Sequence, residues 1–563
     1  MSSLIWTLCL GCLIYASATN FVLILGDDQG WGDVSFNNIH YNTTTSYKIN
    51  QPHTPHLDEM ANSDATIIFH RMYSASAVCS PTRSSILSGR TPKRECISTA
   101  EGCGSKPALS CLDRLPFPPT IFTIAQAAKA ANLTTAHFGK WHLGDFMLKS
   151  HGEANKLNAN DPHRHPVPDK KSGYAYKKWP VSNPGMHGFD TWRSTEASAS
   201  SSTTNCDCNP LWGQEGEGCI ASGGVWSQHG DGCTNYWTPA PNAAEVCRNI
   251  SSPNNILAQV CVINETKKIV GDDSQYIVDH FETFVQKNIA ANTSFLALLW
   301  LHTVHVPHPA LPEYYHAYTD AFGDPAGDYL GTMTQLDVQI GRIRQILNMT
   351  GIRNDTIVMY TADNGAMPTG RDRSLFPALA ATNGLRQCKA SYYEGGIRVP
   401  GLFEWPAMIH KNSKTWYPAS STDFLPTIME LLDVSHPHPT FASDGISLLP
   451  LIKKLSEHPS QNDTTRRSTN HPLHCEGAII DNEWKFIPNP EKGLCKLERG
   501  TIVGRPVLFN LDLDPTETHD LCSVHVSLCS KYKKQWSDLQ ESIQHSQQYE
   551  SLCQKPMGEG AEL

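Results

Sequence analysis

The chain has 563 residues, which is enough for two or more domains and a large hydrophobic core. It is 40% apolar and 18% charged, a composition typical of soluble globular proteins, and its net charge of −10 argues against general nucleic-acid binding. No apolar run beyond the N-terminus is long enough to span a bilayer, so we expect no stable membrane insertion.

The N-terminus predicts entry into the secretory pathway, with a secreted or a lysosomal destination. A short apolar run at residues 4–15 precedes Ala16-Ser17-Ala18, a small-residue cleavage pattern, so we expect residues 1–18 to be a signal peptide. The run has no Lys or Arg before it, which leaves an uncleaved anchor as the alternative. Eight N-x-S/T sequons also favour export. The sequons begin at Asn42, Asn132, Asn249, Asn264, Asn292, Asn348, Asn354 and Asn462.

The first strand of the mature chain ends in two acids. Residues 21–25 are an unbroken apolar run that stops at Gly26, which predicts a buried central strand. Asp27 and Asp28 follow, where open α/β sheets bind their ligands. Adjacent carboxylates repel each other unless a cation lies between them, so we favour a metal site over a surface turn.

Residues 79–90 (CSPTRSSILSGR) predict a loop that enters a helix. Pro81 suits the first helical turn and Gly89 suits the end. The Cys79 side chain would then lie at a helix N-terminus, which favours a bound anion, and Arg83 could fork onto an oxyanion. A disulfide or a buried thiol at Cys79 is the alternative.

Strands and helices alternate along the rest of the chain, which predicts an α/β architecture. We expect further strands at residues 66–69, 134–138, 294–301 and 356–361, with shorter ones at 476–487 and 507–513. Helices are expected to begin at Thr54-Pro55 and at Thr120, and to cover residues 328–349 and 422–432.

Polar residues follow two of the later strands. Lys140 and His142 alternate along an extended segment, so both side chains could point to one face and suit a sulfate; a solvated lysine beside a structural histidine is the alternative. His302, His305 and His308 follow the strand at 294–301 and could bind a transition metal, supply a general acid, or be ordinary loop histidines.

Asp363 and Asn364 follow the strand at 356–361 and mirror Asp27 and Asp28. Four oxygen ligands from two strand ends predict a site for a hard cation such as Ca²⁺ or Mg²⁺. Lys389 follows in a segment that ends in a Gly-Gly turn.

These motifs together resemble the formylglycine-dependent sulfatases of the alkaline-phosphatase-like superfamily, among them arylsulfatases and N-acetylgalactosamine sulfatases. Residues 79–90 are similar to the sulfatase signature C-x-P-x-R with its Leu-x-Gly-Arg tail, and residues 512–517 resemble the C-terminal D-P-x-E segment. The matching stretches run in the family's order from residue 20 to about 521. The resemblance implies a large mixed central sheet flanked by helices, with a smaller C-terminal α+β subdomain.

The resemblance also implies the site. Cys79 is expected to be converted by a formylglycine-generating enzyme into formylglycine, whose hydrate is the nucleophile. One divalent cation, usually Ca²⁺ with Mg²⁺ as the alternative, is expected to bind Asp27, Asp28, Asp363, Asn364 and residue 79. The expected catalytic residues are Cys79, Arg83, Lys140, His142, His305 and Lys389, with the last five lining the sulfate pocket. Asp363 would be a base, and His305 with Lys389 would protonate the leaving alcohol.

The implied activity is release of inorganic sulfate from a sulfate monoester of a carbohydrate or an aryl alcohol. Two other functions stay open. A phosphomonoesterase or phosphodiesterase of the same superfamily usually needs a Ser or Thr nucleophile and two metals, and a catalytically silent protein on this fold would bind sulfated glycans. Residues 149–180 are rich in Lys, Arg and His with only three acids, so a solvated loop there could serve as a rim for a polyanionic substrate.

We expect a catalytic domain at residues 19–455, with a Cys-rich insertion at about 205–262, and a C-terminal subdomain at 456–563. Cys206 and Cys208 are spaced too closely for a zinc pair. Of the 18 cysteines, two leave with the signal peptide and Cys79 is assigned to catalysis, so an odd number remains and at least one thiol is unpaired. Cys388, next to Lys389, is a candidate for it.

Overall fold

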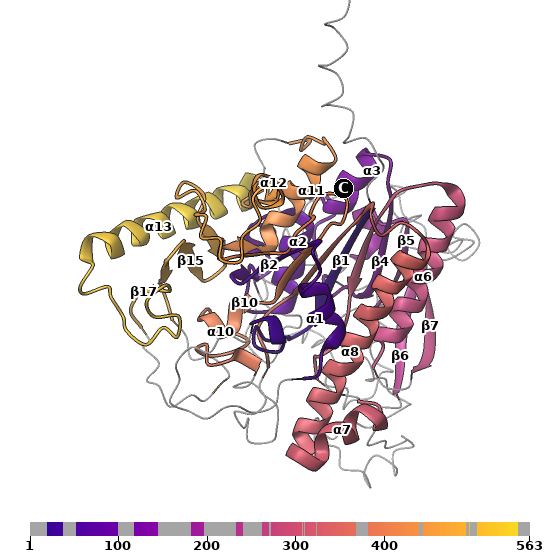
Figure 1. Cartoon of the computed structure of the whole chain (residues 1–563). Coiled ribbons are helices and arrows are strands. Elements are labelled where there is room, and N and C mark those ends of the chain that lie inside the picture. Colours follow the sequence, from indigo (N-terminus) through magenta and orange to yellow (C-terminus); the bar gives the residue numbers. More distant parts are fainter. Residues whose placement is uncertain are drawn as a thin grey trace, which may run out of the picture.

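In this computed structural model a ten-stranded mixed sheet forms the centre of the molecule (Figure 1). The structure describes residues 20–37, 52–98, 117–144, 182–195, 232–239, 262–269, 272–306, 308, 310–322, 324–367, 381–438, 443–490, 495 and 504–549. The strand order is β12-β2-β11-β9-β1-β8-β4-β5-β6-β7. The strands are β1 Asn20–Gly26, β2 Thr66–Phe69, β4 Thr134–Lys140, β5 Thr191–Thr195, β6 Gly232–Pro239, β7 Val262–Ile269, β8 Phe295–Trp300, β9 Thr356–Ala362, β11 Gly401–Glu404 and β12 Ser413–Thr415. The predicted α/β class with a large mixed sheet is confirmed.

The middle of this sheet is parallel. Strand β1 pairs in parallel with β8 and β9, and β4 pairs in parallel with β8 and β5, whereas β11, β6 and β7 run antiparallel to their neighbours. All seven residues of β1 are buried, as expected for a central strand covered on both faces. The carboxyl ends of β1, β4, β8 and β9 therefore meet at one edge of the sheet.

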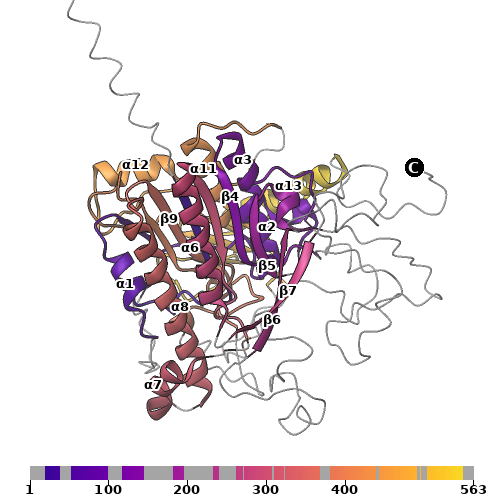
Figure 2. The same cartoon turned by 90° about the vertical axis from the view of Figure 1, so that its right-hand side faces the viewer.

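Helices cover both faces of the sheet (Figures 1 and 2). Alternate residues of β1 enter the two cores: Phe21, Leu23 and Leu25 join the cluster that includes α2, α3, α11 and α12, while Val22 and Ile24 join the one that includes α1, α6 and α8. The helices are α1 Pro55–Ala61, α2 Cys79–Ser88, α3 Ile124–Ala130, α6 Ser274–Ala291, α7 Pro312–Phe322, α8 Asp324–Met349, α10 Glu394–Ile397, α11 Phe424–Leu431, α12 Leu449–Glu457 and α13 Val526–Tyr549. Short 3₁₀ turns cover Ser35–Asn37, Pro92–Glu95, Pro184–His187 and Ser421–Asp423.

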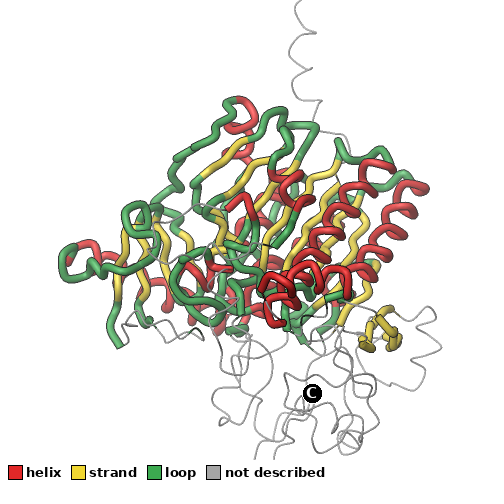
Figure 3. The backbone as a smooth tube through the Cα atoms, turned by 60° about the horizontal axis from the view of Figure 1, so that its bottom comes forward, coloured by secondary structure: helices red, strands yellow, loops and turns green. Residues whose placement is uncertain are grey.

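Two smaller sheets complete the described fold. One has the order β10-β3-β13, with bounds Arg398–Val399, Met72–Tyr73 and Ala419–Ser420. The other is an antiparallel sheet in the order β14-β15-β16-β17, with bounds Leu473–Cys475, Ala478–Asp481, Trp484–Ile487 and Val507–Asn510. Helix α13 packs on this second sheet, which lies beside the large one (Figures 1 and 3). It lies within the predicted C-terminal subdomain, although the exact domain boundaries stay predictions.

One local prediction was wrong, and two strands were missed. The helix expected to begin at Thr120 begins at Ile124, because Thr123 and Gln126 form a reciprocal capping box. Strands β6 and β7 were not anticipated within and after the Cys-rich segment. The signal peptide, the basic stretch 149–180 and most of the insertion at 205–262 lie outside the described residues. Among the residues that the structure describes, no helix combines the length and apolar character needed to cross a bilayer.

Candidate active site

The acids that follow β1 and β9 meet at the carboxyl edge of the sheet. The backbone N–H of Asp28 donates to Oδ1 of Asp363 at 3.1 Å, and the N–H of Asp363 donates to the carbonyl of Gly26 at the same distance. The loop after β8 joins them, since the N–H of Asp27 donates to the carbonyl of Thr303 at 2.9 Å. Adjacent parallel strands thus bring together residues separated by more than 300 positions.

Helix α2 brings Cys79 to these acids. The helix begins at Cys79 and ends at Ser88, and the capping residue Gly89 has a φ of 67°, a left-handed conformation that glycine adopts without strain. The thiol is buried, and its Sγ lies 3.2 Å from Nδ1 of His142. Burial raises the pKa of the thiol, despite the opposing charges of Lys140 and Lys389. An unmodified Cys79 is therefore protonated at neutral pH and is a weak nucleophile.

Three buried oxygen atoms at this edge of the sheet have no hydrogen-bond partner among the described residues: Oδ1 of Asp27, Oδ2 of Asp28 and Oδ1 of Asn364. Ligand atoms of Asp27, Cys79 and Asp363 lie within 4.8 Å of one another. Leaving so many buried oxygens unpaired is costly unless something binds them. The residues fit a hard divalent cation, which prefers carboxylate and amide oxygens.

Two lysines form ion pairs with Asp27 and Asp28. Nζ of Lys140 lies 2.6 Å from Oδ2 of Asp27, and Nζ of Lys389 lies 2.5 Å from Oδ1 of Asp28. Burial alone would raise the pKa values of both carboxyl groups, but these lysines and His305 outweigh it and lower them. Both acids are therefore ionised and able to bind a cation.

Asp363 behaves differently. Burial and then the charge of Asp27 raise the pKa of Asp363 to about 7, although Arg83 opposes the shift. A group with such a pKa can exchange a proton near neutral pH, in line with the base role implied by the resemblance.

Arg83 contacts two parts of the site, Asp363 and the end of β4. It was expected to line the sulfate pocket, but it is fully buried, and its Nε and Nη2 donate to Oδ2 of Asp363 at 3.0 and 2.6 Å. Its Nη1 donates to the carbonyl of Lys140 at 2.8 Å, and its guanidinium lies 5.2 Å from the ring centre of Trp300. All three nitrogens are engaged, so Arg83 positions Asp363 and the end of β4.

The three histidines expected after β8 do not converge on a transition metal. His305 alone reaches the acids, with Nε2 3.6 Å from Oδ2 of Asp28, and His308 packs edge-on against Tyr329. His302 is buried between Oδ2 of Asp273, 2.5 Å from its Nδ1, and Oγ1 of Thr195, 2.7 Å from its Nε2.

His302 is a residue whose role the sequence did not reveal. Thr195 pairs in register with Lys140, so His302 and Asp273 support the end of the strand that carries this lysine. In the sequence, His302 was only one of three closely spaced histidines, and nothing identified Asp273 as its partner.

The prediction that Cys388 is the unpaired thiol was wrong. Cys388 forms a disulfide with Cys495, which fixes the segment that carries Lys389. The free cysteines of the described residues are Cys79 and Cys475, and both are buried. A partner 107 positions away leaves no signal in the spacing of the cysteines.

Comparison with known proteins identifies the family of the chain. The sulfatase family model matches residues 19–434. Rat steryl-sulfatase is 26% identical over 89% of this chain and 85% of its own length, and mouse N-acetylgalactosamine-6-sulfatase is 24% identical over 89% and 82%. The crystal structure titled Ps i-CgsB in complex with k-i-k-neocarrahexaose aligns with a TM-score of 0.59 and 20% identity, covering 92% of this chain and 93% of that one. The chain belongs to the sulfatase family and is a sulfuric ester hydrolase.

Proposed function

We propose that this sulfatase releases inorganic sulfate from a sulfated carbohydrate, using formylglycine at position 79 and one bound Ca²⁺. The observation that carries the proposal is the position of Cys79 beside Asp27 and Asp363, at a strand edge where three buried oxygens lack hydrogen-bond partners among the described residues. Burial keeps the Cys79 thiol protonated, so the unmodified side chain would be a poor nucleophile. An aldehyde hydrate at this position would supply a nucleophilic hydroxyl.

Asp27, Asp28, Asp363 and Asn364 would hold the cation together with residue 79. Its charge would stabilise the anionic sulfate group, and an all-oxygen set with an amide favours Ca²⁺, with Mg²⁺ as the alternative. The two groups of possible ligand atoms in the described residues contain a single histidine, His305, and the nucleophile position holds Cys79. A two-metal phosphatase of the superfamily usually has a Ser or Thr nucleophile, so this set favours a sulfatase.

The charge balance also suits a sulfate monoester. Three carboxylates (Asp27, Asp28 and Asp363) are matched by three basic side chains (Lys140, Lys389 and Arg83), all within ion-pair distance. Because these charges cancel, a divalent cation would leave the site with a net positive charge that attracts an anionic substrate.

His142 is placed to move a proton at residue 79, since its Nδ1 lies 3.2 Å from the side-chain atom there. Burial, aided by Lys140 and Arg83, lowers the pKa of His142 well below its usual value. The ring is therefore neutral at working pH and able to accept a proton.

His305 and Lys389 are the residues we assign to the leaving alcohol. Burial alone would lower the pKa of Lys389, but Asp28 outweighs it and raises the pKa, so the lysine keeps its proton. Burial lowers the pKa of His305 to about 4 against the pull of Asp28 and Asp27, so this ring is neutral and orients the alcohol by hydrogen bonding.

The relatives, a structural neighbour and the sequence itself support the substrate class and the location that we propose. The relatives' names point to sterol and amino-sugar sulfates, and a structural neighbour is solved with a carbohydrate. The basic stretch 149–180 favours a sulfated carbohydrate over an aryl sulfate. We propose that residues 1–18 direct the chain to the secretory pathway, where a formylglycine-generating enzyme acts on Cys79, and then to the exterior or a lysosome.

The test is release of inorganic sulfate by protein secreted from cultured cells. The panel contains defined sulfated mono- and disaccharides, an aryl sulfate, a steryl sulfate and the matched aryl phosphate. We expect the highest kcat/KM on a sulfated sugar and no turnover of the phosphate. Faster phosphate release would favour the phosphatase alternative, and tight binding without sulfate release would favour a silent glycan-binding protein.

A further inference from the structure

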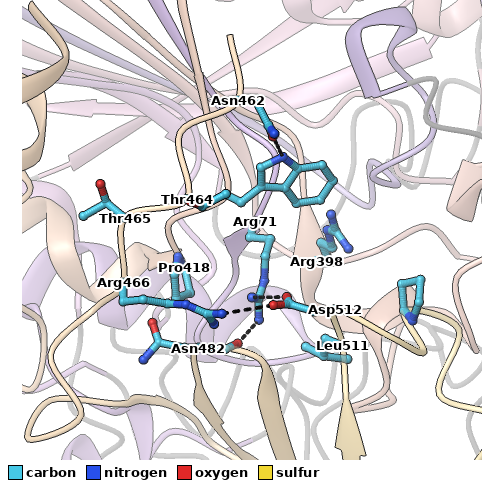
Figure 4. A pocket seen from close by; sticks show the side chains of 12 residues that line it. Arg71, Arg398, Pro418, Asn462, Thr464, Thr465, Arg466, Asn482, Leu511 and Asp512 are labelled. Carbon is cyan, nitrogen blue, oxygen red and sulfur yellow. Dashed lines mark hydrogen bonds and ion pairs between the residues drawn. The ribbon is translucent and has the colours of Figure 1, made fainter. Parts of the chain in front are cut away.

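A second pocket lies outside the active site, at the junction between the three-stranded sheet and the loops beside the four-stranded sheet (Figure 4). Its volume is about 270 Å³, close to the lower end of the range for small-ligand sites (roughly 300–1,000 Å³). Trp416 supplies its aromatic wall, and Asn462, Thr464, Thr465 and Arg466 line one side. The size suits one sugar ring.

A sequon lies on that side of the pocket. Asn462 begins the sequence Asn-Asp-Thr and is exposed. Its Oδ1 accepts a hydrogen bond from Nε1 of Trp416 at 3.0 Å, while its Nδ2 donates no hydrogen bond within the described residues. An N-linked sugar is attached through Nδ2, so the bond to Trp416 would survive attachment and would aim the sugar along the indole.

The backbone holds Asn462 and Trp416 in this arrangement. The N–H of Trp416 donates to the carbonyl of Asp463 at 2.9 Å, and the N–H of Asp463 donates to the carbonyl of Lys414 at 2.9 Å. The buried carboxylate of Asp463 accepts from Oγ1 of Thr415 at 2.7 Å. The sequon is therefore anchored to β12.

The charged side chains of the pocket already have partners. Asp512 pairs with Arg466 at 3.2 Å and with Arg71 at 3.7 Å, and Arg398 pairs with Glu394 at 3.3 Å. A neutral N-acetylhexosamine can occupy the pocket without breaking these pairs, with its ring against Trp416 and its hydroxyls beside the polar groups of the lining.

We propose that Asn462 carries an N-linked glycan whose first N-acetylglucosamine ring occupies this pocket against Trp416. The inference rests on the secretory route proposed above, and not on the identity of the substrate. In the attachment step, Nδ2 of Asn462 forms a bond to the anomeric carbon of a lipid-diphosphate-linked oligosaccharide. The sugar's bond to the diphosphate breaks, the diphosphate leaves, and Nδ2 loses one proton.

Two other sequons provide internal controls. Asn292 and Asn354 are exposed and precede β8 and β9, and neither lines the pocket. The full chain, secreted from mammalian cells, is treated with a peptide N-glycosidase in ¹⁸O water, first in the native state and then after denaturation. Mass spectrometry of the resulting Asp residues gives the rate of glycan release at each site.

We expect the native protein to lose the Asn462 glycan roughly tenfold more slowly than the Asn354 glycan, the factor that about 1.4 kcal/mol of protection would give. Denaturation should make the two rates equal. Trp416→Phe keeps a ring but removes the Nε1 donor and should retain part of the protection, whereas Trp416→Ala should bring the native rates to within about twofold.

Thr464→Ala should abolish the glycan, while Thr464→Ser should retain it, and neither should change kcat. An unmodified Asn462 beside glycosylated Asn292 or Asn354 would overturn the inference and leave the secretory route intact. Equal native release rates in the wild-type protein would overturn the docking. A protein with no glycan at any sequon would overturn both the inference and the secretory route.

Discussion

Two buried clusters, each of which contains acidic and basic side chains, differ in how many of their carboxylate oxygens accept a hydrogen bond. At the start of α11, Asp423 accepts from Nη1 and Nη2 of Arg467 at 2.8 and 2.9 Å, and from the backbone of Ser420 and Ile446. At the carboxyl edge of the sheet, Asp27 and Asp28 each leave one buried oxygen without a hydrogen-bond partner. The two clusters are equally buried, so depth does not explain the difference.

The comparison separates a structural ion pair from a binding site. A structural pair satisfies both oxygens of the carboxylate with protein donors, because each unpaired buried oxygen costs free energy. The strand-end cluster instead leaves three buried oxygens unpaired among the described residues, which is expected when an external cation completes the site.

The largest effect should come from removing the side chain at position 79. We expect Cys79→Ala to lower kcat by roughly 10⁴-fold or more, as for the loss of a catalytic nucleophile, and to leave the fold intact. Cys475→Ala is the matched control, because Cys475 is also a buried free thiol but lies in the four-stranded sheet. Equal losses of sulfate release in the two variants would contradict the assignment.

The next effect tests the structural cluster. Asp423→Asn should lower the free energy of unfolding by about 3–5 kcal/mol, because it leaves the buried Arg467 charge unpaired. Urea unfolding followed by fluorescence measures this loss. Because Asp423 takes no part in the site, kcat per folded molecule should stay unchanged, and a loss of kcat in fully folded protein would remove the distinction between the clusters.

Removal of the cation should have a smaller effect on stability. A chelator should lower the free energy of unfolding by about 2.7 kcal/mol if the metal had been present at 100 times its Kd, and it should abolish sulfate release. Added Ca²⁺ should restore both. The Asp423→Asn variant should show the same response, whereas a wild-type protein whose unfolding is indifferent to chelator would argue against the cation site.

The smallest effect, when it is expressed per pH unit, is the pH dependence of the free energy of unfolding. Burial lowers the pKa of His187 to about 3, whereas in the unfolded chain it titrates near 6.5. Between these values only the unfolded state binds the proton, so the free energy of unfolding falls on acidification below pH 6.5, by up to about 1.4 kcal/mol per pH unit. Above pH 6.5 this group contributes no pH dependence.

His187→Gln should reduce the slope of the free energy of unfolding against pH between 6.5 and 3 by the contribution of about one bound proton. Urea unfolding in a pH series measures this slope. His410→Gln, at an exposed position, is the control. An unchanged slope in His187→Gln would show that the ring titrates normally in the folded protein.

The sequence predicted the core of the fold because its central strands are buried on both faces. The apolar runs at 21–25, 294–301 and 356–361 became β1, β8 and β9, and the polar residues that follow them met as parallel strands require. Capping was less predictable, since Thr120 and Thr123 are both plausible caps and only Gln126 decides between them. Strands β6 and β7 lack an apolar run, so nothing distinguished them from a loop.

For the site, residue identities were predictable and orientations were not. The expected side chains meet at the carboxyl edge of the sheet, yet only the structure shows that Arg83 donates to Asp363 and that His302 supports the end of β4 through Thr195. Long-range partners such as Cys388 with Cys495 depend on how the chain folds in three dimensions, and sequence spacing carries no information about them.

The most direct test of the central claim is the mass of the tryptic peptide of residues 72–83 from protein secreted by cultured cells. The peptide contains Cys79 and is bounded by Arg71 and Arg83. We predict that it carries an aldehyde in place of the thiol and that it reacts with a hydrazide probe. A peptide that retains a plain thiol in protein that still releases sulfate would contradict the account.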